Sequence, residues 1–377
     1  MAVMPLSVTD LACDEINVLA TSMGEPLYRA RQVRKWTYQN LAITFDEMTD
    51  LPLEIRQRLS KEVRLHSLEM VQQVAGADGT VKSLFKCADD KTVESALMFY
   101  GGDGGKERRT VCISTQAGCG IGCPFCATGQ QGFERNLTSG EIIDQVLYFA
   151  RYLRENSIKS ISKDSRHERV SNIVFMGMGE PLANYDNLWK AIETLNAPDC
   201  FKLGARNMTL STSGLVPGIK RLAQEKLQVG LAVSLHAADN ALRNKLVPIN
   251  RKYPLEELMP VCREYSRLTG RRLSFEYILF NGINDSIAQA RELAELVRGF
   301  DCHVNLIAAN TTGNTIYKPP SRRVMLAFEN ELKRHHVNVT FRESRGQDID
   351  AGCGQLRSRY LKATGKKPLN TPRQGKS

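Results

Sequence analysis

The sequence has no apolar run long enough to cross a membrane, and no secretory signal peptide opens it. These two absences lead us to expect a cytoplasmic protein that makes no membrane contact. Ten cysteines without an export signal indicate a reducing compartment. In such a compartment, clustered cysteines are more often metal ligands or catalytic thiols than structural disulfides.

Acidic residues are fewer than basic ones. The 377 residues include 41 Asp and Glu against 51 Lys and Arg, which gives a net charge of +10. Such a balance suggests a polyanionic partner, most often a nucleic acid, although it also serves solubility alone. The length allows one large core and a smaller module.

Residues 1–68 are expected to form a helical domain, because apolar residues recur at helical spacing in VTDLACDEINVLATSMG and EPLYRARQVRKWTYQNL. Residues 28–39 interleave basic side chains with Tyr28, Trp36 and Tyr38, which suits RNA contact through phosphate charge and base stacking. The alternative is an amphipathic helix that packs Trp36 inward and leaves its arginines in solvent. This segment by itself favours the alternative.

Residues 69–104 change character. Two turn signals, Asp78-Gly79 and Asp89-Asp90, separate β-prone runs. We therefore predict a small antiparallel hairpin or meander, followed by a glycine-rich linker.

From residue 105 to residue 350, short β-prone runs alternate with helix-like stretches, which is typical of βαβ units in a parallel sheet. The six runs are RTVCISTQ, VSNIVFMG, NMTLSTSG, VGLAVSLH, LSFEYILF and HVNLIAAN. Six units predict an α/β fold with a partial (βα)6 barrel, because the count falls short of a full eight-unit barrel. Residues 351–377 then form a separate segment with Cys353 and a basic tail.

Three cysteines, Cys119, Cys123 and Cys126, stand within eight residues in QAGCGIGCPFCATG. They follow the first predicted barrel strand, and active sites lie in loops at the carboxyl ends of parallel strands. A structural zinc site needs four ligands, usually as two separated pairs, and no second Cys-x-x-Cys or His pair follows. Three thiolates on a four-iron cluster leave one iron open, so the spacing favours one [4Fe-4S] cluster per chain.

Polar groups also stand at the ends of the other predicted barrel strands. A lone glycine, serine or histidine there is more often structural, but a shared placement at one barrel face indicates a binding site. The candidates are Gly179, Glu180, Ser211, Ser234, Leu235, His236 and Asn310.

Two further cysteines stand alone. By composition, Cys112 and Cys353 would be small buried hydrophobic residues. Glycines flank Cys353, which favours an exposed thiol, and its thiolate could accept a methyl group as a nucleophile.

The C-x3-C-x2-C spacing, with Phe125 before its last cysteine, resembles the signature of the radical S-adenosylmethionine (SAM) enzymes. From residue 25 to Leu356 the chain also resembles the RlmN/Cfr family, in particular the RlmN-type dual-specificity adenine-C2 RNA methyltransferases. The matching stretches are YRARQVRKW, FDEMTDLP, VES, CISTQAGCGIGCPFCATGQQGFERNLTSGEI, FMGMGEPLAN, LSTSG, SLHA, FEYILFNGIND, HVNLI and DIDAGCGQL.

This resemblance implies a [4Fe-4S] cluster on the three clustered cysteines and two SAM molecules per turnover. Gly179, with Glu180 beside it, would receive the amino group of SAM. Cys353 would take a methyl group from the first SAM, and a radical made from the second would remove a hydrogen from that methyl group. The carbon would join C2 of adenine in a transient protein–RNA crosslink. Glu94, in VES, would remove the C2 proton, and Cys112 would release the product by forming a disulfide with Cys353.

The resemblance also implies partners. They are 23S rRNA, through an adenine of the peptidyl-transferase centre, and tRNA, through the adenine after the anticodon. An electron donor such as flavodoxin with its reductase, or ferredoxin, would serve a monomeric enzyme whose residues 1–68 bind RNA. IAANTTG, which contains Asn310, stands where the family has a proline-flanked asparagine motif.

Three other interpretations are open. A Cfr-type enzyme would methylate adenine C8 with the same cysteines, but Pro181 in GEPLAN favours the C2 type, because Cfr-type chains tend to have alanine there. A zinc-stabilised RNA-binding module would have no catalytic use for Cys353. A radical SAM enzyme acting on a small molecule fits the basic charge and the helical N-terminal region less well.

Overall fold

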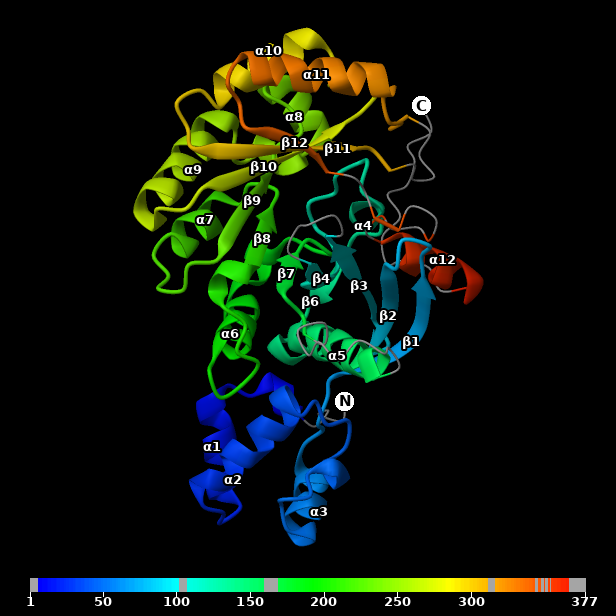
Figure 1. Ribbon diagram of the computed structural model, residues 1–377, viewed down its shortest axis with the longest axis vertical. Helices are drawn as coiled ribbons and strands as arrows, with labels where there is room; N and C mark the ends of the chain where they lie inside the picture. The colour runs from blue at the N-terminus through cyan, green and yellow to red at the C-terminus, as the bar shows by residue number, and fades with distance from the viewer. Residues whose placement is uncertain are drawn as a thin grey trace.

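The computed structural model describes residues 6–101, 107–158, 169–310, 316–342, 345–346, 349, 352 and 354–365. Helices at the N-terminal end lie below a large curved sheet, and further helices cover the outside of that sheet (Figure 1). None of the helices described is both long enough and apolar enough to cross a lipid bilayer.

The N-terminal region is helical, as predicted. Its elements are η1 (Val8–Asp10), α1 (Cys13–Ser22), α2 (Leu27–Arg34), η2 (Lys35–Gln39), η3 (Phe45–Glu47) and α3 (Leu53–Glu62). Tyr38 is fully buried, and Trp36 is half-buried with its Nε1 donating to Oδ1 of Asp50 at 2.6 Å. The packing interpretation of this segment is therefore correct for both aromatic rings, whereas Tyr28 remains exposed. Arg34 is buried instead of solvated.

The predicted meander is confirmed. It comprises β1 (Leu68–Ala75), β2 (Val81–Cys87) and β3 (Thr92–Tyr100), each antiparallel to the next, and β3 pairs antiparallel with β4 (Arg108–Cys112). Both turn signals are used as expected, because Gly79 and Asp90 adopt left-handed backbone angles, at φ +80° and +62°. The meander thus extends the barrel sheet past its first strand.

The six predicted barrel strands are all present and parallel. They are β4, β7 (Asn172–Phe175), β8 (Met208–Thr212), β9 (Gly230–Ser234), β10 (Leu273–Leu279) and β11 (Cys302–Ala308). A seventh parallel strand, β12 (Val339–Arg342), was not predicted. Its four residues are bounded by polar sequence, so its apolar alternation is too short to recognise. A separate pair, β5 (Gln116–Gly118) and β6 (Phe133–Asn136), encloses the cysteine loop.

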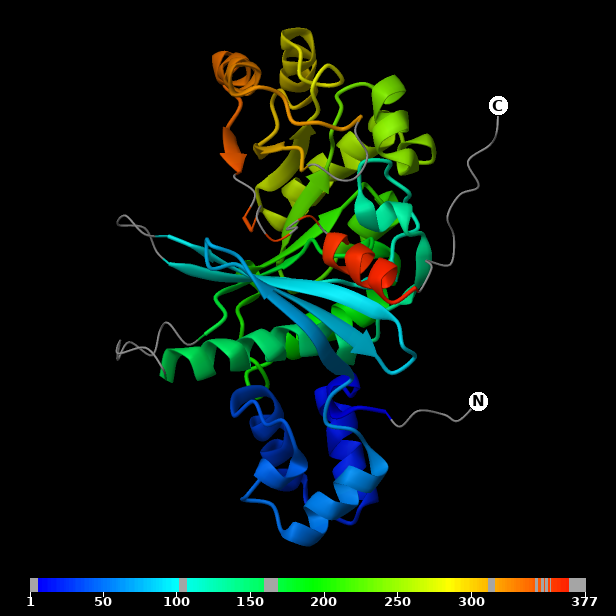
Figure 2. The same ribbon diagram turned by 90° about the vertical axis from the view of Figure 1, so that its right-hand side faces the viewer.

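Helices cover the outer face of the parallel strands (Figures 1 and 2). They are α5 (Ser139–Ile158), α6 (Tyr185–Asn196), α7 (Val216–Leu222), α8 (Asn240–Leu246), α9 (Leu255–Thr269), α10 (Ile287–Leu296) and α11 (Arg322–Arg334), with short turns η5 (Pro181–Asn184), η6 (Ala205–Asn207) and η7 (Pro248–Arg251). Two further helices lie near the cysteine loop, α4 (Ala127–Gln130) and α12 (Gln355–Ala363), and α12 packs beside the meander (Figure 2).

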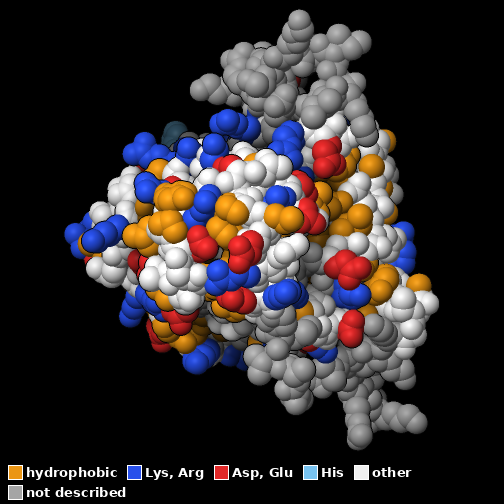
Figure 3. Space-filling view, turned by 90° about the horizontal axis from the view of Figure 1, so that it is seen from below, with side chains coloured by type: hydrophobic (Ala, Val, Ile, Leu, Met, Phe, Trp, Pro, Cys, Tyr) orange, Lys and Arg blue, Asp and Glu red, His pale blue; other side chains and the backbone are white. Residues whose placement is uncertain are grey.

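The N-terminal region joins the barrel through polar contacts to α5 and to the loop after α6. The Gly140 N–H donates to Oδ1 of Asp10 at 2.9 Å, and Nδ1 of His66 lies 2.8 Å from Oδ1 of Asp144. Seen from below, this end of the molecule mixes basic, acidic and hydrophobic side chains (Figure 3). Basic side chains are therefore not gathered into one continuous patch on this face.

Candidate active site

The cysteine loop is folded tightly between β5 and α4. Gly118 has φ +77°, and a Cβ there would lie 1.9 Å from the carbonyl oxygen of Gly132, so no other residue fits. The Cys119 N–H donates to that same carbonyl at 2.8 Å, and the Cys126 N–H donates to the carbonyl of Cys123 at 3.1 Å. These bonds fix the backbone that carries the three thiols.

The three thiols are half-buried and influence one another electrostatically, although their sulfur atoms are not all within 4.8 Å of one another. Burial raises the pKa of Cys119 to about 12, and it also raises the pKa of Cys123, with the neighbouring thiols Cys126 and Cys119 adding to the effect. Phe125 packs edge-on against His236, with ring centroids 5.2 Å apart. A positive iron centre would favour the thiolate form at such a site, so the donor set and its surroundings fit an iron–sulfur cluster.

The Gly179–Glu180 pair is built into the turn after β7. Gly179 has φ +105°, and a Cβ there would lie 2.6 Å from Cβ of Gln116. The Glu180 carboxylate accepts hydrogen bonds from the Ser213 N–H at 2.8 Å and the Ser213 hydroxyl at 2.7 Å. Burial raises the pKa of Glu180, against the lowering effect of these bonds. The carboxylate thus holds the turn after β8, and its contact with SAM stays a prediction.

At the end of β9, Ser234, Leu235 and His236 differ in burial and in the groups they offer to a ligand. Ser234 is half-buried on the inner face, whereas the Leu235 side chain is fully buried in the core, so Leu235 offers a ligand only its backbone. His236 has φ +59°, and its Nδ1 accepts the Ile278 N–H at 3.1 Å. Burial and the nearby Arg243 lower the pKa of His236 to about 3, so the ring is neutral with its proton on Nε2.

Ser211 and Asn310 are the other two residues predicted to bind SAM. Ser211 is half-buried at the end of β8, the strand next to β9. Asn310 is exposed two residues after β11, and residues 311–315 lie outside the described part of the chain. The two side chains therefore stand at the carboxyl ends of their strands, as predicted.

A second centre lies on the meander side. Glu94 and Cys112 line one pocket, together with Lys82 and Met178. The strand register explains this, because Cys112 of β4 is opposite Ala96 of β3, which is opposite Lys82 of β2, with Glu94 diagonal to Lys82. Glu94 and Cys112, which are 18 positions apart in the sequence, therefore lie on the same face of the sheet.

The Glu94 carboxylate is held by an ion pair and by the segment that contains Cys353. Nζ of Lys82 lies 2.8 Å from Oε2 of Glu94 and donates to the carbonyl of Gly352 at 2.8 Å. The Gly354 N–H donates to Oε2 of Glu94 at 2.9 Å, and the Arg357 N–H donates to Oε1. Cys353 itself lies outside the described residues, but the positions on either side of it are tied to Lys82 and Glu94. Lys82 gave no signal in the sequence.

Arg357 connects α12 to the cysteine loop. Its buried guanidinium donates to Oγ1 of Thr92 at 3.0 Å, to Oε1 of Gln131 at 2.6 Å and to Oε1 of Glu134 at 2.6 Å. Gly354 has φ +82°, and a Cβ there would lie 2.6 Å from Oγ1 of Thr128 in α4. The segment after Cys353 therefore packs directly against the residues that follow the cysteine loop.

Comparison with known proteins places the two regions in one family. Residues 6–65 match the model described as "Ribosomal RNA large subunit methyltransferase N-terminal domain", and residues 113–294 match the radical SAM superfamily. The chain is 46% identical over 97% of its length to a probable dual-specificity RNA methyltransferase RlmN of Chloroflexus aurantiacus, covering 95% of that protein. This chain belongs to the RlmN family. The corresponding protein of Geobacillus kaustophilus is 43% identical, with 94% of this chain and 93% of that one covered.

A solved structure agrees with this assignment. A radical SAM methyltransferase from Sphaerobacter thermophilus is 46% identical and superposes with a TM-score of 0.87, over 93% of this chain and 99% of that one. As an RlmN family member, the chain is a SAM-dependent RNA methyltransferase that uses a [4Fe-4S] cluster. Cys119, Cys123 and Cys126 are the thiols that fit that cluster.

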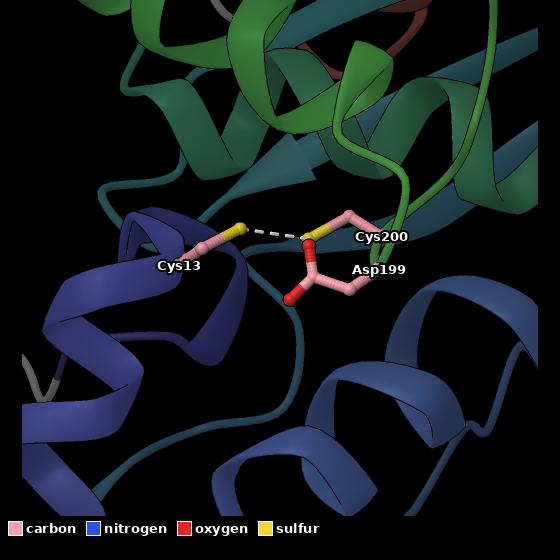
Figure 4. Close-up of side chains that lie close together, drawn as sticks. All are labelled: Cys13, Asp199 and Cys200. Atoms are coloured by element: carbon pink, nitrogen blue, oxygen red, sulfur yellow. Dashed lines mark hydrogen bonds between the residues drawn. The ribbon is translucent and has the colours of Figure 1, made fainter.

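One further cluster of potential ligands was missed by sequence reasoning. Sγ of Cys13, Sγ of Cys200 and a carboxylate oxygen of Asp199 lie within 4.8 Å of one another (Figure 4). The two sulfur atoms are 2.9 Å apart, and the hydrogen bond from Cys200 lowers the pKa of Cys13. Thiolates sharing a tetrahedral zinc ion stand roughly 3.8 Å apart, as follows from the Zn–S bond length. This spacing is therefore that of a hydrogen-bonded thiol pair, which joins α1 of the RlmN family's N-terminal domain to the barrel.

Proposed function

We propose that this chain makes 2-methyladenosine in 23S rRNA and in tRNA, through a methylated Cys353 and a transient protein–RNA crosslink. One observation carries the proposal: Glu94 and Cys112 share a pocket, and Glu94 and Lys82 bind the backbone on either side of Cys353. Glu94 and Cys112 thus line one pocket, and the backbone next to Cys353 is bonded to the same pocket.

The reaction needs such a set because C2 of adenine is a poor nucleophile, so direct polar transfer from SAM is difficult. The Cys353 thiolate first takes the methyl group of SAM and releases S-adenosylhomocysteine. When bound, the cluster supplies the electron that cleaves a second SAM reductively. The 5′-deoxyadenosyl group released from that SAM would take one hydrogen atom from the methyl group on Cys353, and the remaining methylene carbon would bond to C2. The adduct would then give up its unpaired electron to the electron carrier.

The remaining steps fall to Glu94 and Cys112. Glu94 takes the C2 proton on its carboxylate, which also accepts the N–H groups of Gly354 and Arg357. The Cys112 thiolate then attacks Sγ of Cys353 and breaks the carbon–sulfur bond. The methylene carbon released from sulfur takes up a proton and stays on the RNA as a methyl group, and the disulfide is returned to two thiols by an external reductant.

The N-terminal region is proposed to contact RNA, and the enzyme is proposed to work as a monomer that receives electrons from flavodoxin or ferredoxin. The N-terminal region is joined to the barrel by buried polar contacts, which would keep bound RNA oriented toward the barrel. The exposed rings and apolar side chains of this region, such as Tyr28 and Leu27, offer stacking and packing surfaces.

The test is to identify the product. Anaerobically reconstituted protein is incubated with SAM, a reductant and either an rRNA fragment or tRNA, and nucleosides are separated by mass spectrometry. We expect 2-methyladenosine from both RNAs. 8-Methyladenosine would show instead that the C8 alternative is right, and a lack of methylation on tRNA would restrict the substrate to rRNA.

A second experiment tests the role of Cys112. Cys112→Ala should leave RNA covalently attached to the protein through Cys353, visible on a denaturing gel. Cys87→Ala, which removes another cysteine of the meander, should show no such complex. Free turnover by Cys112→Ala would exclude Cys112 from the mechanism.

A further inference from the structure

A polar cavity of about 590 Å³ occupies the inside of the barrel. The strands that form it contribute mainly polar side chains, in contrast to the branched apolar residues that usually fill barrel interiors. Among its lining residues are Asn172, Thr209, Ser274, Glu276, Asn305 and Arg342. A cavity of this size and polarity is within the range that holds a small ligand or a nucleotide.

The cavity lies directly beneath the residues predicted to bind SAM. Side chains two residues apart on a strand share a face, so Thr110 leads to Cys112, Thr209 to Ser211 and Ala232 to Ser234. The cavity therefore lies on the same face of β4 as Cys112.

Glu276 carries an unused acceptor into this space. Only 6% of the residue is exposed, and its Oε1 accepts the Asn305 amide at 2.8 Å. Asn305 is held in turn by the Thr340 hydroxyl at 3.3 Å. Within the described part of the chain, Oε2 of Glu276 has no hydrogen-bond partner. A buried carboxylate oxygen without a donor is costly, which points to a donor on a bound molecule.

The rim of the cavity is basic and aromatic. Arg108, Arg342 and Arg345 line it together with Tyr100. The guanidinium carbons of Arg108 and Arg345 lie 5.5 Å and 5.2 Å from the centre of the Tyr100 ring. Nε of Arg345 is buried without a hydrogen-bond partner among the described residues. Arginines beside a half-buried ring are suited to the phosphates and bases of single-stranded RNA.

We propose that this cavity receives the target adenine after it leaves its stack, with Oε2 of Glu276 accepting a hydrogen bond from the exocyclic amino group and the rim arginines holding the flanking phosphates. Asn305 is a positioning residue that orients Glu276. This inference rests on the proposed function and adds the residues that select adenine. Enzymes that modify a base in RNA read its flipped edge in this way.

The same amino group is present on the adenine of SAM, which is the other source of this chemistry. Glu276 pairs in register with Ser234, one of the residues predicted to bind SAM. The two sources differ in what they require: a SAM contact acts without RNA, whereas an RNA contact depends on the base at the target position. An experiment must therefore vary the RNA and the SAM separately.

The experiment uses a tRNA anticodon stem-loop that carries either adenine or purine, which lacks the amino group, at the target position. Binding and single-turnover methylation are measured for the reconstituted wild type, Glu276→Gln and Glu276→Ala. The wild type should prefer adenine by about tenfold or more, the value of one hydrogen bond to a charged group. Glu276→Ala should bind both RNAs almost equally, and Glu276→Gln, which keeps an acceptor, should keep part of the preference.

The matched control is Glu331→Gln on α11, a carboxylate with only 4% exposure that pairs with Arg291 on the outside of the barrel. It should retain the full preference. The SAM arm measures SAM binding by equilibrium dialysis and methylation of Cys353 without RNA, and neither should change in Glu276→Ala. Thermal unfolding checks that each variant is folded.

Two results would overturn the inference. One is a wild-type preference that survives in Glu276→Ala, and the other is a loss of SAM binding in that variant with the RNA preference intact. If the wild type forms no 2-methyladenosine, the proposed function fails, and the binding comparison still decides whether Glu276 reads the base.

Discussion

The molecule holds two thiol centres that are stabilised in opposite ways. The cysteine loop gathers three thiols from eight consecutive residues in an apolar setting, where burial raises the pKa of Cys119 to about 12. The meander centre gathers a charged pair, Lys82 and Glu94, with both side chains only 4% exposed. In the loop, the proposed cluster would supply the positive charge that favours the thiolates, whereas the meander centre depends on having every protein partner in place.

The largest effect is expected from the loop. Cys123→Ser should abolish methylation, because a cluster with two protein thiolates is not held, while the free energy of unfolding changes little. Iron content, absorbance of the cluster and product formation are measured together. Cys262→Ala, which removes a buried thiol of α9, is the control and should keep its iron. Activity in the iron-free Cys123→Ser protein would break the comparison.

The next effect is expected from the ion pair. Lys82→Met leaves the buried Glu94 carboxylate without its cation, and breaking such a pair costs about 3–5 kcal/mol of unfolding free energy. Denaturant unfolding measures this value, and iron content should stay unchanged. Lys86→Met on the same strand breaks an exposed pair with Glu69 and should lower the free energy of unfolding far less. Equal costs for the two variants would contradict the role assigned to burial.

A smaller, local effect is expected at α12. Arg357→Met removes the donor groups that join α12 to Thr92, Gln131 and Glu134. Hydrogen exchange across residues 355–363 should accelerate, by the factor that corresponds to about 1.5–3 kcal/mol of opening free energy. Lys362→Met, at an exposed position of the same helix, should leave exchange as it is. Unchanged protection in Arg357→Met would mean that the Glu94 contacts suffice to hold the helix.

The smallest effect concerns pH. Burial raises the pKa of Glu276 above its ordinary value, against the lowering effect of Arg342 and of the Asn305 hydrogen bond. The folded state then binds the proton more tightly than the unfolded state, so this contribution to stability is present in acid and is lost as the pH rises. Glutamine at position 276 cannot ionise, so Glu276→Gln does not lose stability as the pH rises. The stability of this variant relative to the wild type should therefore increase from about pH 4 to about pH 7. Parallel stability curves across that range would show that burial does not control this group.

Much of the architecture could be predicted because it is encoded locally. The Asp78-Gly79 and Asp89-Asp90 turns define the meander, and each of the six predicted parallel strands has a recognisable β-prone run. The four-residue β12 has no such run, and it joins the sheet only through pairing with β11. The aromatic residues of 28–39 show the same limit, since only packing against Asp50 and the core decides which ring is exposed.

By itself, the sequence determined the cysteine loop, since three thiols within eight residues stay near one another however the rest of the chain folds. It also determined the order of helices and strands, because their apolar periods are local properties. The tertiary structure decided the environment of Glu94, whose partners Lys82, Gly352 and Arg357 come from distant segments brought together by strand register and by α12. It likewise decided the barrel cavity, because an unpaired oxygen on Glu276 exists only once seven strands curve around it. Hydrogen-bond satisfaction is a property of the folded chain, and no residue pattern specifies it in advance.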